Sequence, residues 1–247
     1  MFQSEMEKGR MDDILKTLKK TELFSNIPEE VILQEVMPHR QLQEYRKGVF
    51  LIEQQQKVNR FGIVLSGKIH IMHIFPEGNY SLMSALTVGE ILGADLIHTR
   101  SQLSPYYAMA ATPARVLYFP AGLLTSPGLM QEVWRLEALN HLVTWISHEN
   151  MKKEYRLAIL SQKGLRERIM TYLTMQSIRL QKTSFAISFS REELAAFLCV
   201  NRSALSHELS LMQQEGIITF HKNYFSLEHL QLSDGRLLSD SEPALLF

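Results

Sequence analysis

The chain has 247 residues, which is enough for two domains, and its 26 basic residues balance its 26 acidic residues, so the formal net charge is zero. No apolar run is long enough to span a membrane, and the N-terminal segment is charged without an apolar core, which argues against a signal peptide and favours a cytoplasmic protein. The single cysteine, Cys199, excludes an internal disulfide, a multi-thiolate iron–sulfur cluster and a cysteine-rich zinc site.

The first half of the chain predicts helices followed by a small β-structure. Residues 12–37 show the apolar spacing of helices, with a break near Phe24–Pro28. From Arg46 to Pro120, short β-rich runs alternate with glycines, and the clearest runs are 49–52, 61–65, 68–74 and 114–119. Strands at this spacing with glycine turns are typical of a small antiparallel barrel or roll.

A long helix is predicted next. Ser126-Pro127 indicates its start, because proline suits the first helical position, and we expect the helix to end near residue 162. Steps of three and four residues separate Leu136, Leu139, Val143, Ile146, Asn150, Lys153, Leu157 and Leu160. This spacing predicts a heptad seam between two copies of the chain, with Asn150 fixing the register. The alternative is a helix that lies against its own domain.

Gly164 marks a hinge, beyond which the sequence predicts a helix-turn-helix. Ser190 and Glu193 form a capping box that starts the first helix. Asn201 is a good N-cap for the second helix. The inward-facing apolar residues of the two helices are Leu194, Phe197, Leu198, Leu205, Leu209 and Met212.

The outer face of the second helix carries groups that suit DNA. A recognition helix presents its N-terminal residues to base edges in the major groove, and arginine can pair bidentately with guanine. The runs 216–220 and 224–227, separated by three residues, predict a hairpin and therefore a winged module with Lys222 at its tip. We expect the DNA-contacting residues to be Arg191, Asn201, Arg202, Ser203, Ser206, His207 and Lys222.

Charge distribution supports this expectation. From Met151 to Leu230, Lys and Arg outnumber Asp and Glu, which duplex-phosphate binding requires even when the whole chain is neutral.

This order of elements resembles the Crp/Fnr superfamily of bacterial transcription regulators. The motifs that carry the resemblance are 48–51, 62–69, 89–93 and, most strongly, 190–209. The resemblance implies an α+β chain: helices and a β-roll sensor domain over 1–125, a dimerisation helix over 126–162, a winged helix-turn-helix over 163–230 and a tail over 231–247. It also implies a homodimer that binds double-stranded DNA and RNA polymerase, with an effector controlling it from the roll.

The roll departs from the cyclic-nucleotide-binding members of that family. Those members hold the ribose with Gly-Glu and the phosphate with a later Arg-Ser, whereas here Gly93 precedes Ala94 and the Arg-Ser place is Ser104-Pro105. A buried phosphate without a cation is costly, so we expect no cyclic AMP binding and instead a small organic, aromatic effector. Its expected lining residues are Gly93, Ala94, Asp95, Ser104, Tyr106 and Tyr107.

No cofactor is expected either. The chain lacks the N-terminal cysteine cluster of the oxygen-sensing members, and nothing marks His70, His73 or His98 as haem ligands.

The recognition helix departs from the family pattern as well. Arg202 matches the family's first arginine, but Ser203 stands in the place of its glutamate and His207 in the place of its later arginine, so the half-site should differ from TGTGA. Cys199 occupies a turn position where many such motifs have glycine, and we expect it to be a small buried residue.

Two other functions compete with DNA binding. A metal-dependent cupin-type enzyme needs two histidines on one strand face, but His70 and His73 are three residues apart and point to opposite faces, so we expect no catalytic or metal site. A signalling module whose winged domain binds protein is the stronger alternative, and its partner binding would be insensitive to salt.

Overall fold

The structure is a computed structural model that describes residues 2–227, with side chains from Met11 onward. The chain forms two compact units, Met1–Asn79 with Met83–Met151 and Tyr80–Leu82 with Lys152–Phe247. The predicted tail, 231–247, lies outside the described residues. No helix within residues 2–227 combines the length and the apolar character needed to cross a membrane.

One long and several short helices form the start of the first unit. They are α1 (Phe2–Lys20), η1 (Glu22–Phe24), α2 (Glu29–Val31), η2 (Ile32–Val36) and η3 (Met37–His39). The predicted break near Phe24–Pro28 is present between η1 and α2, and Leu23, Phe24 and Ile27 around it are fully buried in the core.

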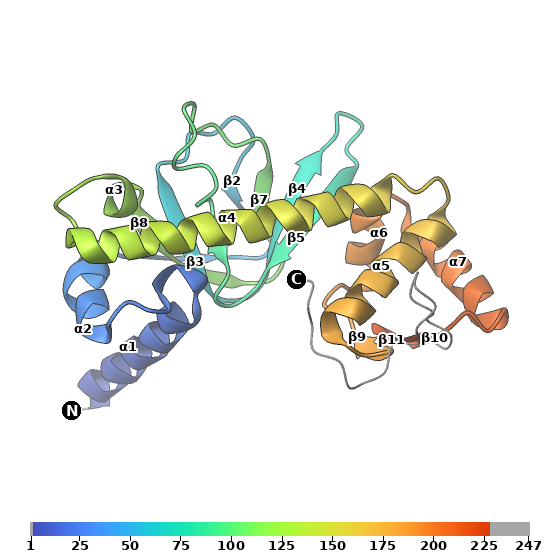
Figure 1. The fold of residues 1–247 in the computed structure, drawn as a ribbon, viewed down its shortest axis with the longest axis horizontal. Helices are drawn as coiled ribbons and strands as arrows, with labels where there is room; N and C mark the ends of the chain where they lie inside the picture. The colour runs from blue at the N-terminus through green and yellow to red at the C-terminus, as the bar shows by residue number, and fades with distance from the viewer. Residues whose placement is uncertain (1, 228–247) are drawn as a thin grey trace. The chain divides into compact units, whose positions relative to one another are not determined.

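Two four-stranded sheets form the roll of the first unit (Figure 1). One has the order β1 (Gln41–Tyr45), β8 (Ala114–Pro120), β3 (Arg60–Ser66), β6 (Ile91–Leu92). The other has the order β2 (Phe50–Ile52), β7 (Tyr107–Ala110), β4 (Ile69–Ile74), β5 (Tyr80–Leu86). Sequence reasoning found β2, β3, β4 and β8 and missed the other four, which have no clear alternation of apolar residues.

The sheet that contains β3 and β8 has two buried faces. Phe61, Phe119 and Phe24 of η1 pack together on the outer face, with ring centroids 5.6–6.5 Å apart. Gly62 lies on the inner face, where an added Cβ would come within 2.6 Å of Val116 Cγ1 and 2.9 Å of Tyr118. Glycine is therefore required at residue 62 for the inner face to pack.

The central helix begins later than the sequence predicted. After α3 (Gly122–Thr125), the main helix α4 spans Glu132–Leu160, so Ser126-Pro127 does not start it. Gly128 takes φ +97°, which breaks the helical path. The start is fixed instead by a distant residue, because the Glu35 carboxylate accepts hydrogen bonds from the backbone N–H and the side-chain amide of Gln131, each at 2.7 Å.

The second unit contains the helix-turn-helix and a small sheet. Its elements are α5 (Leu165–Leu180), β9 (Ser184–Ala186), α6 (Arg191–Phe197), α7 (Arg202–Gln214), β10 (Ile218–His221) and β11 (Tyr224–Leu227). The sheet order is β10-β11-β9, and the sequence did not predict β9. A β-rich N-terminal domain, a long helix and C-terminal helix-turn-helix helices confirm the predicted α+β class.

Candidate DNA interface

The N-terminus of α7 is capped as the sequence predicts. The side-chain oxygen of Asn201 accepts from the backbone N–H of Ala204 at 2.7 Å and from the Ser203 hydroxyl at 2.8 Å. The cap fixes where the helix begins, and it engages the Asn201 side-chain oxygen in hydrogen bonds within the protein. Only the side-chain amide donors of Asn201 are left for DNA.

The two faces of α7 differ sharply. Leu205, Leu209 and Met212 are fully buried against α5, α6 and the sheet. Arg202, Ser203 and His207 are exposed on the opposite side, and Ser206 is partly exposed. The side chain of Arg202 makes no hydrogen bond or ion pair with another described residue, so its guanidinium is available to a ligand.

The side chain of Arg191, at the start of α6, packs against the hairpin that forms the wing. Its guanidinium lies 4.9 Å from the Phe220 ring centroid and 5.7 Å from that of Phe225, and it donates to the backbone carbonyl of Lys222 at 3.0 Å. Partial burial and, second, the positive charge of Arg202 lower the pKa of Arg191. Arg191 therefore holds the hairpin, and it lies close enough to Arg202 for the two positive charges to repel each other.

The hairpin turn presents Lys222 in a strained conformation. Lys222 and Asn223 connect the paired residues His221 and Tyr224, and Lys222 is exposed with φ +54°. A left-handed conformation costs a lysine of order 1–3 kcal/mol, and the Arg191 hydrogen bond helps to offset that cost. Two hydrogen bonds of 2.9 Å also join the turn to Ile187. The Ile187 N–H donates to the Asn223 carbonyl, and the Asn223 side-chain amide donates to the Ile187 carbonyl.

A clamp on α7 escaped sequence reasoning. Arg166 at the start of α5 binds Glu208 through Nε at 2.6 Å and Glu215 through both terminal nitrogens at 2.6 and 3.0 Å. These hydrogen bonds raise the pKa of Arg166 and lower that of Glu215. Because both carboxylates are occupied, the unpaired charge near α7 is positive, which favours an anionic partner.

The turn between α6 and α7 corrects one expectation. Cys199 is exposed, not buried, and has φ +57°. It stands at the left-handed position of a tight turn, where the backbone direction turns its side chain outward, while Leu198 and Ala195 fill the core beside it. Arg168 supports the same turn by donating to the Leu198 carbonyl at 3.3 Å.

The residues predicted to line an effector site largely satisfy one another. Tyr106 donates to Asp95 at 2.9 Å, and the fully buried Ser104 hydroxyl donates to the Tyr106 carbonyl at 2.8 Å. Burial, and then the charge of Asp95, raises the pKa of Tyr106. Ala94 is fully buried and apolar, and Gly93 takes φ +77°. These positions offer no cation and few free polar atoms to a ligand.

Tyr107 lies apart from that cluster in its contacts. It is on β7 and its ring packs against Phe50 with centroids 5.5 Å apart.

Within residues 2–227, no group of three or more His, Cys, Asp and Glu side chains is arranged to hold a metal ion.

The predicted seam residues of α4 divide into two groups. Leu136, Val143, Asn150 and Leu157, which follow each other at seven-residue intervals, are all exposed, and so is Ile146. Leu139 is partly buried against the core of the first unit. Val133 and Met151 are also exposed, at 61% and 48%, and were not in the predicted set. An apolar stripe on a surface helix is typical of an interface.

Two known domain families match the chain. Residues 42–126 match the cyclic nucleotide-binding domain, and residues 167–232 match the Crp-like helix-turn-helix domain. The first match covers the roll from β1 to the end of α3, and the second covers the winged unit from α5 onward.

Most of the chain is also similar to known proteins and solved structures. Electron transport regulator A of Shewanella oneidensis is 23% identical over 199 residues, which is 76% of this chain and 75% of the relative. The structure of a CooA mutant from Carboxydothermus hydrogenoformans has a TM-score of 0.64 at 20% identity, covering 82% of this chain and 91% of CooA. FixK2 from Bradyrhizobium japonicum has a TM-score of 0.60 at 17% identity, covering 77% and 93%. These two structures share the fold.

Proposed function

Because this chain belongs to the Crp/Fnr superfamily of transcription regulators, we propose that it acts as a homodimer that binds a near-palindromic operator under the control of a small effector in the roll. The observation that carries this proposal is the exposed face of α7, where Arg202 has no partner in the described chain while the buried face is fully packed. An arginine so placed on a recognition helix is suited to guanine O6 and N7.

Phosphate binding is supported by the surroundings of Arg202. The N-terminus of a helix carries a partial positive charge and free N–H groups, which favour a phosphate. Lys222 on the hairpin adds a second exposed cation, and Arg191 holds the hairpin in place. Ser203, Ser206 and His207 would read or position the bases beside the guanine that Arg202 contacts.

Dimerisation is supported by the exposed stripe of α4. Two such helices would bury Leu136, Val143 and Leu157 against their counterparts, with Asn150 setting the register. The two recognition helices of a symmetric dimer enter successive major grooves about 34 Å apart, so the operator should be a near-palindrome. Contact with RNA polymerase is part of the same proposal.

The effector is proposed to be a small organic molecule other than cyclic AMP. The cassette is the set of residues expected to line the effector site, namely Gly93, Ala94, Asp95, Ser104, Tyr106 and Tyr107. Its Ala94 and buried Ser104 leave it without the cation that a cyclic phosphate needs. The effector would act by binding one state of the dimer more tightly than the other, and it can shift that equilibrium only by its difference in affinity.

Selection of binding sites from random duplexes tests the proposal. The full-length protein should enrich a motif with two inverted half-sites whose centres lie about 10–10.5 base pairs apart. Its affinity for that motif should fall about 10³–10⁵-fold between 50 and 200 mM salt if six to ten phosphates are contacted.

Two results would overturn the proposal. Failure to retain any duplex at low salt would exclude DNA binding, and salt-insensitive binding to a protein would favour the interaction module. A monomer at micromolar concentration in sedimentation, together with an asymmetric selected motif, would exclude the dimer.

A further inference from the structure

A polar cluster lies on the inner face of the roll, outside the cassette predicted to bind the effector. Arg60, Gly62 and Val64 alternate along β3 and share one face, and Val64 belongs to the buried core between the sheets. Tyr118, the neighbour of Gly62 on β8, belongs to the same core and is 3% exposed. The side chain of Arg60 is therefore placed at the edge of the roll interior.

Two contacts fix the orientation of the Arg60 guanidinium. Its central carbon lies 3.9 Å from the centroid of the Tyr118 ring, and one terminal nitrogen donates to Gln43 Oε1 at 3.1 Å. Tyr45 hydrogen-bonds the same oxygen, and its hydroxyl lies 3.0 Å from that of Tyr118. Burial and this hydroxyl contact raise the pKa of Tyr118, so its hydroxyl stays protonated.

Arg60 has no carboxylate partner among residues 2–227. Arg115, by contrast, pairs with Glu44 at 3.5 Å. The Arg60 side chain makes one hydrogen bond within the described chain, so most of its five N–H donors have no protein partner there and face solvent, where a ligand can reach them. A partly buried guanidinium with a fixed orientation and no carboxylate beside it presents its free donors to an anion at low cost in side-chain ordering.

The cluster is next to the cassette. A Cβ added to Gly93 would lie 3.4 Å from the backbone oxygen of Arg60 and 3.4 Å from Val58, so the two segments touch. The cassette lacks a cation, and Arg60 supplies one from the adjoining strand.

We infer that the effector of the roll is a small carboxylate that docks on the free edge of Arg60, with the Gln43 amide as a second donor. This inference rests on the proposed function, which places an effector in the roll. A planar guanidinium fork matches the two oxygens of a carboxylate, and a single cation balances a single negative charge. Phosphate, with more charge and oxygens, would need further donors.

Thermal unfolding of the full-length protein tests the inference with defined probes. Acetate, succinate and benzoate are compared with neutral benzamide, inorganic phosphate and cyclic AMP at constant ionic strength. At least one carboxylate should raise the unfolding midpoint by about 3–6 °C when its concentration is tenfold above its Kd. Arg60→Gln should abolish that shift, whereas Arg100→Gln, at an exposed arginine of the cassette loop, should keep it.

Protection of the wild-type protein from phenylglyoxal provides a measurement that needs no variant. The stabilising carboxylate should slow modification of Arg60 at least fivefold, read by peptide mass spectrometry, and leave Arg100 unchanged. No stabilisation by any of the three carboxylates, an equal shift in Arg60→Gln, or unprotected Arg60 would overturn the inference. Stabilisation by phosphate or cyclic AMP alone would overturn the assignment to carboxylates.

Duplex retention measured on the same samples separates this inference from the proposed function. Loss of the carboxylate response with DNA binding intact would refute only the anion site. Absence of DNA binding by the wild type would refute the proposed function, whatever the carboxylates do.

Discussion

Replacement of Arg202 by alanine separates a base contact from a phosphate contact. The side chain of Arg202 is exposed and makes no hydrogen bond within the described chain, so the free energy of unfolding should change by less than about 0.5 kcal/mol. A lost bidentate pair with guanine costs about 1–3 kcal/mol, and a dimer loses two, so binding to the selected operator should weaken by about 2–6 kcal/mol.

Fluorescence anisotropy with the selected operator, and with an operator changed at the contacted guanine, measures this loss. Arg202→Ala should bind the two duplexes almost equally, because the variant no longer distinguishes that base. Arg202→Lys keeps the charge but not the fork, so it should recover affinity for both duplexes without recovering the discrimination.

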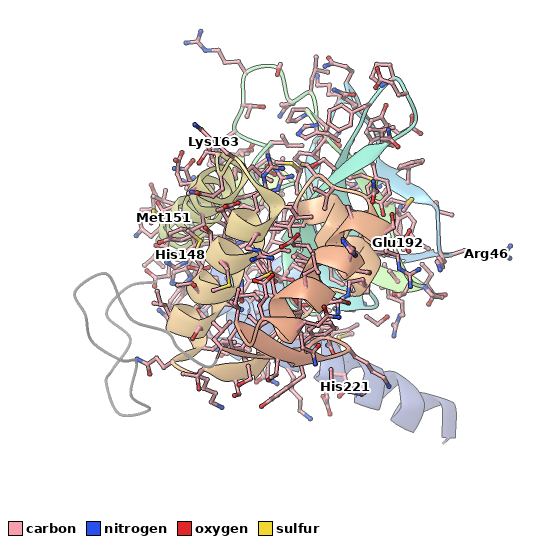
Figure 2. All side chains as sticks on the ribbon, turned by 90° about the vertical axis from the view of Figure 1, so that its right-hand side faces the viewer. Arg46, His148, Met151, Lys163, Glu192 and His221 are labelled. Carbon is pink, nitrogen blue, oxygen red and sulfur yellow. The ribbon has the colours of Figure 1, made fainter. Side chains whose placement is uncertain are left out.

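Lys222→Ala gives the contrasting behaviour. It should weaken binding to all duplexes alike and reduce the slope of log K against log salt by about 2 for the dimer, since each phosphate contact contributes about 0.9. Lys163→Ala is the matched control, because Lys163 and the hairpin residue His221 lie at opposite ends of this unit (Figure 2). Equal, sequence-independent losses for Arg202→Ala and Lys222→Ala would refute the base contact.

The wing, the central helix and the Arg166 clamp give three more tests. Arg191→Ala should weaken binding to every duplex several-fold because it releases the hairpin, and amide exchange at the turn should quicken; unchanged exchange would exclude a positioning role. Val143→Glu should make the protein monomeric in sedimentation by placing a charge in the seam, whereas the adjacent Thr144→Glu should not; a stable Val143→Glu dimer would contradict the seam. Because the folded-state pKa of Glu215 is lowered, its stabilising effect is full above the unfolded value of about 4.3 and disappears as pH falls through the folded value. The wild type should therefore unfold at a higher temperature than Glu215→Gln at pH 7, and this difference should shrink as the pH falls below about 4.3; a difference that stays constant from pH 7 down to acid unfolding would contradict the clamp.

Local signals explain why much of the second unit was predictable. The capping box at Ser190 and the cap at Asn201 involve residues no more than three positions apart, so the start of each helix is encoded locally. The spacing of Leu205, Leu209 and Met212 then fixes which face of α7 is buried and leaves Arg202 outside.

Contacts between distant residues explain what the sequence left undecided. The start of α4 depends on Glu35, nearly a hundred positions away, and so it was placed too early. The contact of Arg191 with the rings of Phe220 and Phe225 could not be predicted either, because those residues lie about thirty positions further along the chain; DNA contact by Arg191 stays a prediction.

The sequence by itself determined the order of the elements, the family and the outward face of the recognition helix, because helical periodicity and caps act over a few residues. Only the tertiary structure decided which polar side chains are committed and which are free. Asp95 and Ser104 are engaged with Tyr106, while Arg60 is stacked on Tyr118 without a carboxylate. Such pairing depends on strands far apart in the chain meeting in one sheet, which no local pattern encodes.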